Sequence, residues 1–117
     1  MTKHNGGCHC GKVAFEVELD LSQPVLSCNC SICSKRGSLL AFTTPKHFDL
    51  KSGEADLTDY QFNKHNIHHL FCATCGILSF ARAKTPDGDD GIAINVRCLE
   101  GVEIDKLKLH PYDGRSA

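Results

Sequence analysis

The chain has 117 residues, of which 41% are hydrophobic, and its 13 basic and 14 acidic side chains leave a formal net charge of −1. This balance excludes the strongly basic surface with which proteins bind nucleic acid or anionic membranes, so we expect neither as a partner. The length suits one domain over residues 1–117, whose modest core has six Phe, two Tyr and no Trp.

Alternating apolar residues predict a mostly β fold. Val13, Phe15, Val17 and Leu19 recur with a period of two, which is typical of a half-buried strand. Further strands are predicted over residues 24–27, 38–43, 57–62, 67–71, 77–83, 92–97 and 105–109, which are separated by turn-forming residues. Residues 31–36 are expected to form a single helical turn, and the last seven residues, from Pro111, an exposed tail.

Seven of the eight cysteines fall into three short clusters. The clusters are Cys8 and Cys10, then Cys28, Cys30 and Cys33, then Cys72 and Cys75. A disulfide framework would require an oxidising compartment. Residues 1–7 have no apolar h-region, and no stretch approaches the roughly 20 apolar residues that span a membrane. We therefore expect a cytoplasmic protein whose reduced thiols bind metal.

Spacings of C-x-C and C-x-x-C let two sulfurs turn toward one ion. Four thiolates complete the tetrahedral coordination of a zinc ion, whereas three leave one coordination position open. Two pairings satisfy these spacings. In one, Cys30 and Cys33 join Cys72 and Cys75 in a zinc ribbon. In the other, Cys8 and Cys10 join Cys72 and Cys75, and the remaining cluster of three thiolates forms a second, open site.

The remaining candidate ligands are assigned other roles. Cys98 lies on a predicted strand and is interpreted as a small buried hydrophobe. His4 and His9 are not expected to bind metal, because His4 precedes two glycines and His9 points away from its flanking cysteines. His68 and His69 are expected to face opposite sides of one strand, where one of them could donate a hydrogen bond to a sulfur.

Three motifs in this order resemble the glutathione-dependent formaldehyde-activating enzyme family. They are residues 7–15 (GCHCGKVAF), 28–33 (CNCSIC) and 71–76 (FCATCG). The similarity continues through residues 94–102 (INVRCLEGV), so it covers nearly all of the chain. Residues 60–63 (YQFN) and 69–72 (HLFC) are also similar to the centromere protein V branch of that family.

The resemblance implies an Mss4-like, mostly β fold with two zinc ions. A structural zinc would be held by Cys8, Cys10, Cys72 and Cys75, and a catalytic, more labile zinc by Cys28, Cys30 and Cys33. This chain is shorter than the founding enzymes, and Asn29 and Ser34 stand where many members have His and Arg.

Three thiolates leave bound Zn²⁺ with a net charge of −1, which favours capture of a further thiol over activation of water. The implied activity is a carbon–sulfur lyase that adds glutathione to formaldehyde or a similar small aldehyde, giving S-hydroxymethylglutathione. Lys35, Arg36 and Arg97 are candidates to bind a glutathione carboxylate. The alternative is a non-catalytic, zinc-stapled module that binds a macromolecular partner.

Overall fold

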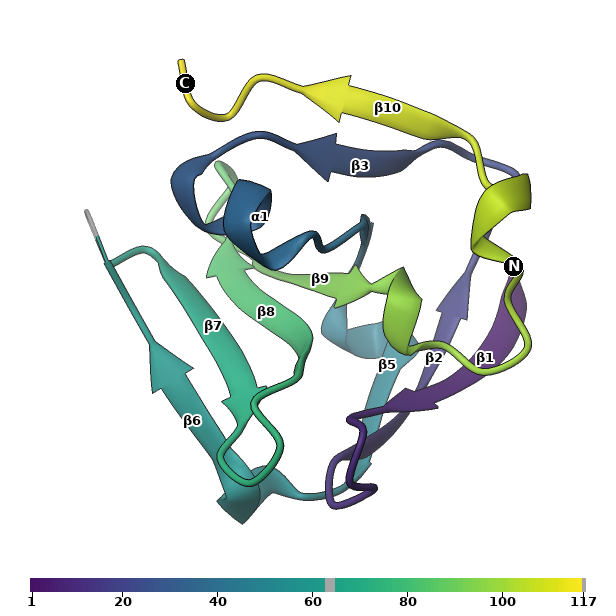
Figure 1. The fold of residues 1–117 in the computed structure, drawn as a ribbon, viewed down its shortest axis with the longest axis vertical. Helices are drawn as coiled ribbons and strands as arrows, with labels where there is room; N and C mark the ends of the chain where they lie inside the picture. Colours follow the sequence, from purple (N-terminus) through teal and green to yellow (C-terminus); the bar gives the residue numbers. More distant parts are fainter. Residues whose placement is uncertain (63–64, 117) are drawn as a thin grey trace.

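The computed structural model describes residues 1–62 and 65–116 and contains a small and a large β-sheet (Figure 1). The three-stranded sheet has the order β1-β2-β5, made of β1 (Thr2–Gly7), β2 (Ala14–Leu19) and β5 (Phe48–Ser52). The seven-stranded sheet has the order β10-β3-β4-β9-β8-β7-β6. The predicted mostly β fold is confirmed.

The large sheet is antiparallel except at one edge, where β10 runs parallel to β3. Its strands are β3 (Val25–Cys28), β4 (Leu40–Thr43), β6 (Leu57–Tyr60), β7 (Ile67–Cys72), β8 (Leu78–Lys84), β9 (Asp90–Asn95) and β10 (Leu109–Tyr112). The helical elements are α1 (Ser31–Arg36), η1 (Pro45–His47), η2 (Glu54–Asp56), η3 (Val96–Cys98) and η4 (Ile104–Lys106). The helical turn over residues 31–36 was correctly predicted.

One apolar core joins the two sheets. Phe15 on β2 and Phe80 on β8 are 2% and 0% exposed, and the ring of Phe48 on β5 lies between them, with ring centroids 5.5 Å and 4.8 Å away. Phe15, Val17 and Leu19 are buried while Glu18 is exposed, which confirms the alternation predicted for β2. Burial of these side chains holds in fixed positions the strand ends and turns at which the cysteine clusters lie.

Two strands of the small sheet were missed by the prediction. The sequence of β1, TKHNGG, has no apolar alternation, and its residues are ordered by backbone pairing with β2 rather than by burial. In β5, Phe48 and Leu50 do alternate and pack on the core, so a period-two signal was present there.

The predicted strand over residues 92–97 ends early, at Asn95. The side chain of Asn95 accepts a hydrogen bond of 3.2 Å from the backbone N–H of Arg97, which turns the chain into η3. Arg97 therefore lies in η3 and not on the strand predicted for it.

The end of the chain also differs from the prediction. Residues 104–106 form the 3-10 turn η4 instead of beginning a strand, and β10 starts only at Leu109. Pro111 and Tyr112, expected in an exposed tail, pair with Ser27 and Cys28 of β3. The side chains of β10 are exposed, so the strand is held by backbone hydrogen bonds that leave no apolar pattern in the sequence. Asn63 and Ala117 lie outside the described residues.

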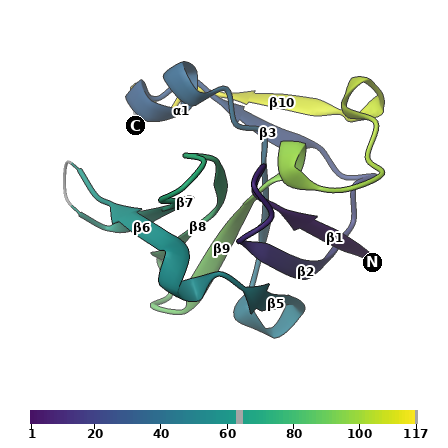
Figure 2. The ribbon, with the colours of Figure 1, turned by 60° about the horizontal axis from the view of Figure 1, so that its bottom comes forward.

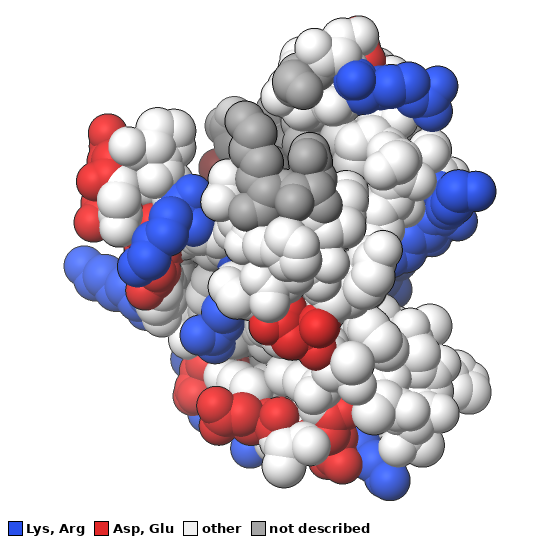
Figure 3. Space-filling view, turned by 90° about the vertical axis from the view of Figure 1, so that its left-hand side faces the viewer, with Lys and Arg blue, Asp and Glu red and all other residues white. Residues whose placement is uncertain are grey.

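The face shown in Figure 3 carries basic and acidic side chains of both signs, without one large patch of either. Along residues 1–62 and 65–116, no helix has the length and apolar character needed to cross a membrane.

Candidate metal centres

The first candidate centre, here called the four-cysteine cluster, joins two turns that are far apart in the sequence. Cys8 and Cys10 lie between β1 and β2, Cys72 is the last residue of β7, and Cys75 lies between β7 and β8. The four Sγ atoms lie within 4.8 Å of one another. The Sγ atom of Cys10 is 3.6 Å from those of Cys8 and Cys72. A tetrahedron with Zn–S bonds of about 2.3 Å has S···S edges of about 3.8 Å. The cluster therefore fits a tetrahedral ion of this size.

Backbone hydrogen bonds shape the Cys72 to Cys75 turn around this centre. The N–H of Cys72 donates to Ile77 O at 3.0 Å, and the N–H of Gly76 donates to Cys72 O at 2.8 Å. Gly76 has a φ of +79°, a left-handed conformation that favours glycine, and it lets the chain reverse directly after Cys75. Both sulfurs of the pair are thereby turned to the same side.

Without metal, Cys75 and Cys10 differ strongly in pKa. Hydrogen bonds from the backbone N–H groups of Cys10 and Ile77 lower the pKa of Cys75 to about 6. At Cys10 the backbone N–H of Lys12 favours the thiolate, but burial and the neighbouring sulfurs outweigh it and raise the pKa to about 11. One thiolate is thus already present at neutral pH, and a bound cation would displace the remaining protons.

The second candidate centre, the three-cysteine cluster, is built locally around α1. Cys28 ends β3, Cys30 is the N-cap of α1 and Cys33 lies within it, with the three Sγ atoms within 4.8 Å of one another. The N–H of Cys30 points at Cys28 Sγ, 3.4 Å away. A tetrahedral ion held by three sulfurs accepts one further ligand, which distinguishes this cluster from the first.

In the three-cysteine cluster, the pKa values of Cys33 and Cys30 are shifted in opposite directions. Burial raises the pKa of Cys33 to about 12, with a contribution from the neighbouring Cys30 sulfur. Burial opposes ionisation of Cys30 as well, but hydrogen bonds from the backbone and side chain of Cys33 and from Cys28 outweigh it and lower its pKa. Ionising all three thiols therefore requires positive charge nearby.

Arg36 supplies such a charge from the last turn of α1. Its Nη2 lies 3.8 Å from Cys33 Sγ, its Nε donates to Ser38 Oγ at 2.6 Å, and its Nη1 lies 3.3 Å from His69 Nδ1. The guanidinium thus faces a cluster sulfur. Lys35, by contrast, is exposed.

His69 holds Arg36 from the β7 side. Because Arg36 can only donate, His69 Nδ1 must accept, which assigns the ring proton to Nε2. That Nε2 is buried and has no partner among the described residues, and the ring stacks on Phe62 with centroids 5.4 Å apart. Burial, and next the charge of Arg36, lower the pKa of His69 and keep it neutral.

The expectation that neighbouring histidines face opposite sides is confirmed, because His68 Nδ1 contacts Asp59 Oδ2 at 2.7 Å while His69 faces Arg36. The contact expected between a histidine and a sulfur is made by Arg36 instead. Nothing in the sequence pattern connected β7 with α1.

Residues 113–116, here called the strap, cover the three-cysteine cluster on one side. Asn29 Nδ2 donates to Asp113 Oδ1 at 3.0 Å, and the N–H of Arg115 donates to Asn29 Oδ1 at 3.0 Å. A Cβ atom on Gly114 would lie 2.6 Å from Cys28 Sγ, so only glycine allows this approach. Figures 1 and 2 show this end of the chain beside the β3–α1 turn. Residues 113–116 were expected in an exposed tail, and no sequence pattern predicted the strap.

The substitution Asn29→Ala removes both side-chain hydrogen bonds that hold the strap. We expect metal to leave the three-cysteine cluster about three- to tenfold faster, because loss of two hydrogen bonds lets the strap detach and exposes Cys28. Competition with a chromogenic chelator measures this rate. Asn5→Ala, on the exposed face of β1, is the matched control and should release metal at the wild-type rate. An unchanged rate in folded Asn29→Ala would contradict a protective strap.

A cavity of about 520 Å³ opens beside the three-cysteine cluster, between β3, α1 and the segment leading into β10. Its lining includes Cys28, Cys33, Arg97 and Asp105. Arg97 Nε donates to Gly37 O at 3.1 Å, which anchors the guanidinium at the cavity. Of the three basic residues singled out in the sequence, Arg97 is the one that lines this cavity.

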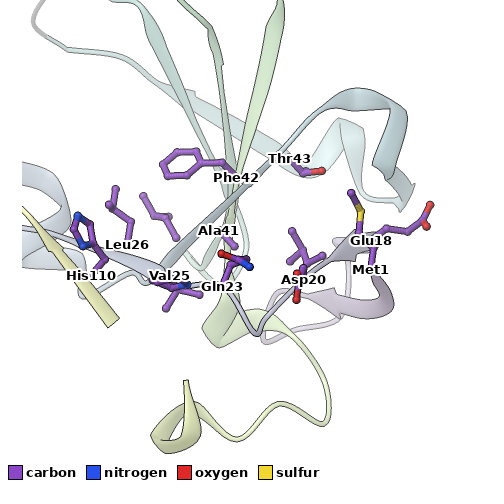
Figure 4. A pocket seen from close by; sticks show the side chains of 13 residues that line it. Met1, Glu18, Asp20, Gln23, Val25, Leu26, Ala41, Phe42, Thr43 and His110 are labelled. Atoms are coloured by element: carbon purple, nitrogen blue, oxygen red, sulfur yellow. The ribbon is translucent and has the colours of Figure 1, made fainter. Parts of the chain in front are cut away.

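A second cavity, of about 590 Å³, lies where β3 and β4 diverge (Figure 4). Leu26, Phe42 and His110 are among its lining residues, and neither cysteine cluster contributes to it. Despite its larger volume it offers no thiol chemistry, and the cavity beside the three-cysteine cluster is the better candidate site.

Cys98 lies outside both clusters. Its Sγ contacts Leu78 O at 3.5 Å, and burial raises its pKa, which suits a small, partly buried side chain that stays protonated. His4 and His9 also lie outside both clusters.

Comparison with known proteins agrees with this arrangement. A crystal structure of a Rhodobacter sphaeroides protein superposes with a TM-score of 0.79 at 35% sequence identity, covering 92% of this chain and 97% of that one. The match supports the Mss4-like, mostly β fold. A family profile described as glutathione-dependent formaldehyde-activating enzyme matches residues 3–112. With its two cysteine clusters, this chain belongs to the glutathione-dependent formaldehyde-activating enzyme family.

Proposed function

We propose that the protein is a zinc-dependent carbon–sulfur lyase of the cytoplasm that adds glutathione to formaldehyde or a similar small aldehyde. Cys28, Cys30 and Cys33 would hold the catalytic zinc, and the four-cysteine cluster the structural one. The observation that carries the proposal is the cluster of three convergent sulfurs, two of whose residues, Cys28 and Cys33, line a cavity of about 520 Å³. This volume lies within the range of about 300–1,000 Å³ usual for small-molecule sites.

The proposed reaction is an addition that needs no redox cofactor. The glutathione thiol gives up its proton, its sulfur forms a bond to the aldehyde carbon, and the C=O π electrons move to the oxygen, which takes up one proton. When bound, zinc would hold an incoming thiol in its ionised form at neutral pH. The protein would contribute chiefly by bringing two small reactants together in a defined orientation.

Different residues near the cavity are proposed to bind the substrate and to balance the charge of the thiolates. Arg97 is available to bind a glutathione carboxylate, since its anchoring bond to Gly37 uses only Nε. Arg36, which lies outside the cavity lining and contacts Cys33 Sγ, would balance the negative charge of the three thiolates. The strap lies close to Cys28 on one side, and the cavity would give the substrate an approach to Cys28 and Cys33. Lys35 lies outside the cavity lining and is the weakest of the candidate carboxylate-binding residues.

A glutathione titration of the Co²⁺-substituted protein tests the proposal, because the visible absorption of Co²⁺ reports its ligands. We expect a saturable spectral shift in the wild type that is absent in Cys30→Ser. Cys98→Ser, a cysteine outside both clusters, is the matched control and should respond like the wild type. Formation of S-hydroxymethylglutathione from formaldehyde would then be followed by NMR.

A spectrum that does not respond to glutathione would contradict the enzyme proposal and favour a zinc-stapled binding module. One observation supports that alternative. Phe42 is 64% exposed beside the apolar cavity between β3 and β4, where a partner could bind (Figure 4).

A further inference from the structure

The cavity beside the three-cysteine cluster has two charged residues in its lining, one of each sign. They are Arg97, from η3, and Asp105, from η4. Neither is in an ion pair within the described part of the chain, although six other pairs are formed there. A guanidinium and a carboxylate that line one cavity complement a ligand that carries both a carboxylate and an ammonium group.

The position of Asp105 is set by its neighbours. Ile104 and Leu107 pack against the hydrophobic core, and the N–H of Leu107 donates to Ile104 O at 3.1 Å, which closes the turn. The adjacent Lys106 pairs with Glu103 at 2.9 Å, leaving Asp105 as the acidic residue of this turn that lines the cavity. The backbone at Asp105 is therefore held beside the cavity by a turn anchored on both sides.

We propose that Asp105 is a specificity-determining residue that binds the α-ammonium group of the thiol substrate, while Arg97 binds its carboxylate. This inference rests on the proposed function, since it explains how the proposed active site would distinguish one thiol from another. Glutathione carries both groups on its γ-glutamyl end. Thiols without an ammonium group leave Asp105 unpaired and bind more weakly.

The experiment measures dissociation constants from the absorption of the Co²⁺-substituted protein. Two ligands are compared, glutathione and glutaryl-cysteinylglycine, which differs by lacking the α-amino group. Wild type and Asp105→Asn are titrated with each. We expect removal of the amino group to weaken binding to the wild type about tenfold, as for loss of one charge-assisted hydrogen bond. Asp105→Asn should weaken glutathione binding by a similar factor and leave the des-amino ligand unaffected.

Glu103→Gln is the matched control. It removes the same charge two positions away, from a side chain that pairs with Lys106 and lies outside the cavity lining, and it should preserve the tenfold preference. Equal affinity of the wild type for both ligands would overturn the role of Asp105 while leaving the proposed function standing. Equal weakening of both ligands by Asp105→Asn would also overturn it. If neither ligand shifts the wild-type spectrum, the proposed function itself fails.

Discussion

Replacing Cys72 with Ser is expected to unfold the protein or lower its melting temperature by on the order of 20 °C. Cys72 is 0% exposed and belongs to the four-cysteine cluster, which joins the β1–β2 turn to the β7–β8 turn. Structural zinc sites contribute about 10 kcal/mol or more to folding, comparable to the total stability of a small domain. Thermal unfolding followed by circular dichroism, together with zinc content per chain, measures the effect.

Two cysteine variants serve as controls for Cys72→Ser. Cys30→Ser alters the three-cysteine cluster, which is built within residues 28–33, so we expect it to lose one metal ion but keep most of its melting temperature. Cys98→Ser leaves both clusters intact and should keep both ions. A Cys72→Ser protein that retains the wild-type zinc content and melting temperature would show that the four-cysteine cluster is not a structural metal site.

Replacing Arg36 with Met is expected to weaken metal binding at the three-cysteine cluster about 10- to 100-fold, the usual cost of losing a group that contacts a metal ligand. The guanidinium lies 3.8 Å from Cys33 Sγ, and its charge opposes the rise in the pKa of Cys33 that burial causes. Without it, Cys33 ionises less readily and three thiolates lose their compensating charge. Competition titrations with a zinc chelator at constant pH measure the affinity.

Lys35→Met is the matched control, because it removes the same charge from the adjacent residue, whose side chain is exposed. It should bind zinc about as tightly as the wild type. Arg36→Lys keeps the charge but cannot contact Cys33, Ser38 and His69 together, so we expect an intermediate affinity. Equal affinities of Arg36→Met and Lys35→Met would show that Arg36 acts only through net charge.

The short-range features of the fold were predictable because their signals lie within a few residues. The alternation of Phe15, Val17 and Leu19 predicted β2, and the C-x-C-x-x-C spacing placed Cys28, Cys30 and Cys33 around one turn of helix. Asn95 shows how such a signal fails. Residues 92–97 have the sequence pattern of one strand, but the side chain of Asn95 accepts a hydrogen bond from the backbone N–H of Arg97, and the strand ends at Asn95.

The pairing of the distant cysteines was left open by spacing alone, since Cys72 and Cys75 suit either partner pair. The resemblance favoured Cys8 and Cys10 as the partners. The structure brings the sulfurs of both pairs together, because the β1–β2 and β7–β8 turns meet at one edge of the core. Motif spacing describes what two neighbouring sulfurs can do. It carries no information on which turns the sheets bring into contact.

By itself, then, the sequence determined the mostly β class, the grouping of its cysteines into short motifs suited to metal binding and, through those motifs, the family. Only the tertiary structure decided what surrounds the three-cysteine cluster: Arg36 buttressed by His69, the strap held by Asn29, and the cavity with Arg97 and Asp105. Local patterns arise from burial and backbone geometry over a few residues. These features instead bring residues 28–37 together with β7, η3, η4 and residues 113–116, which are remote in sequence and become neighbours only when the sheets pack.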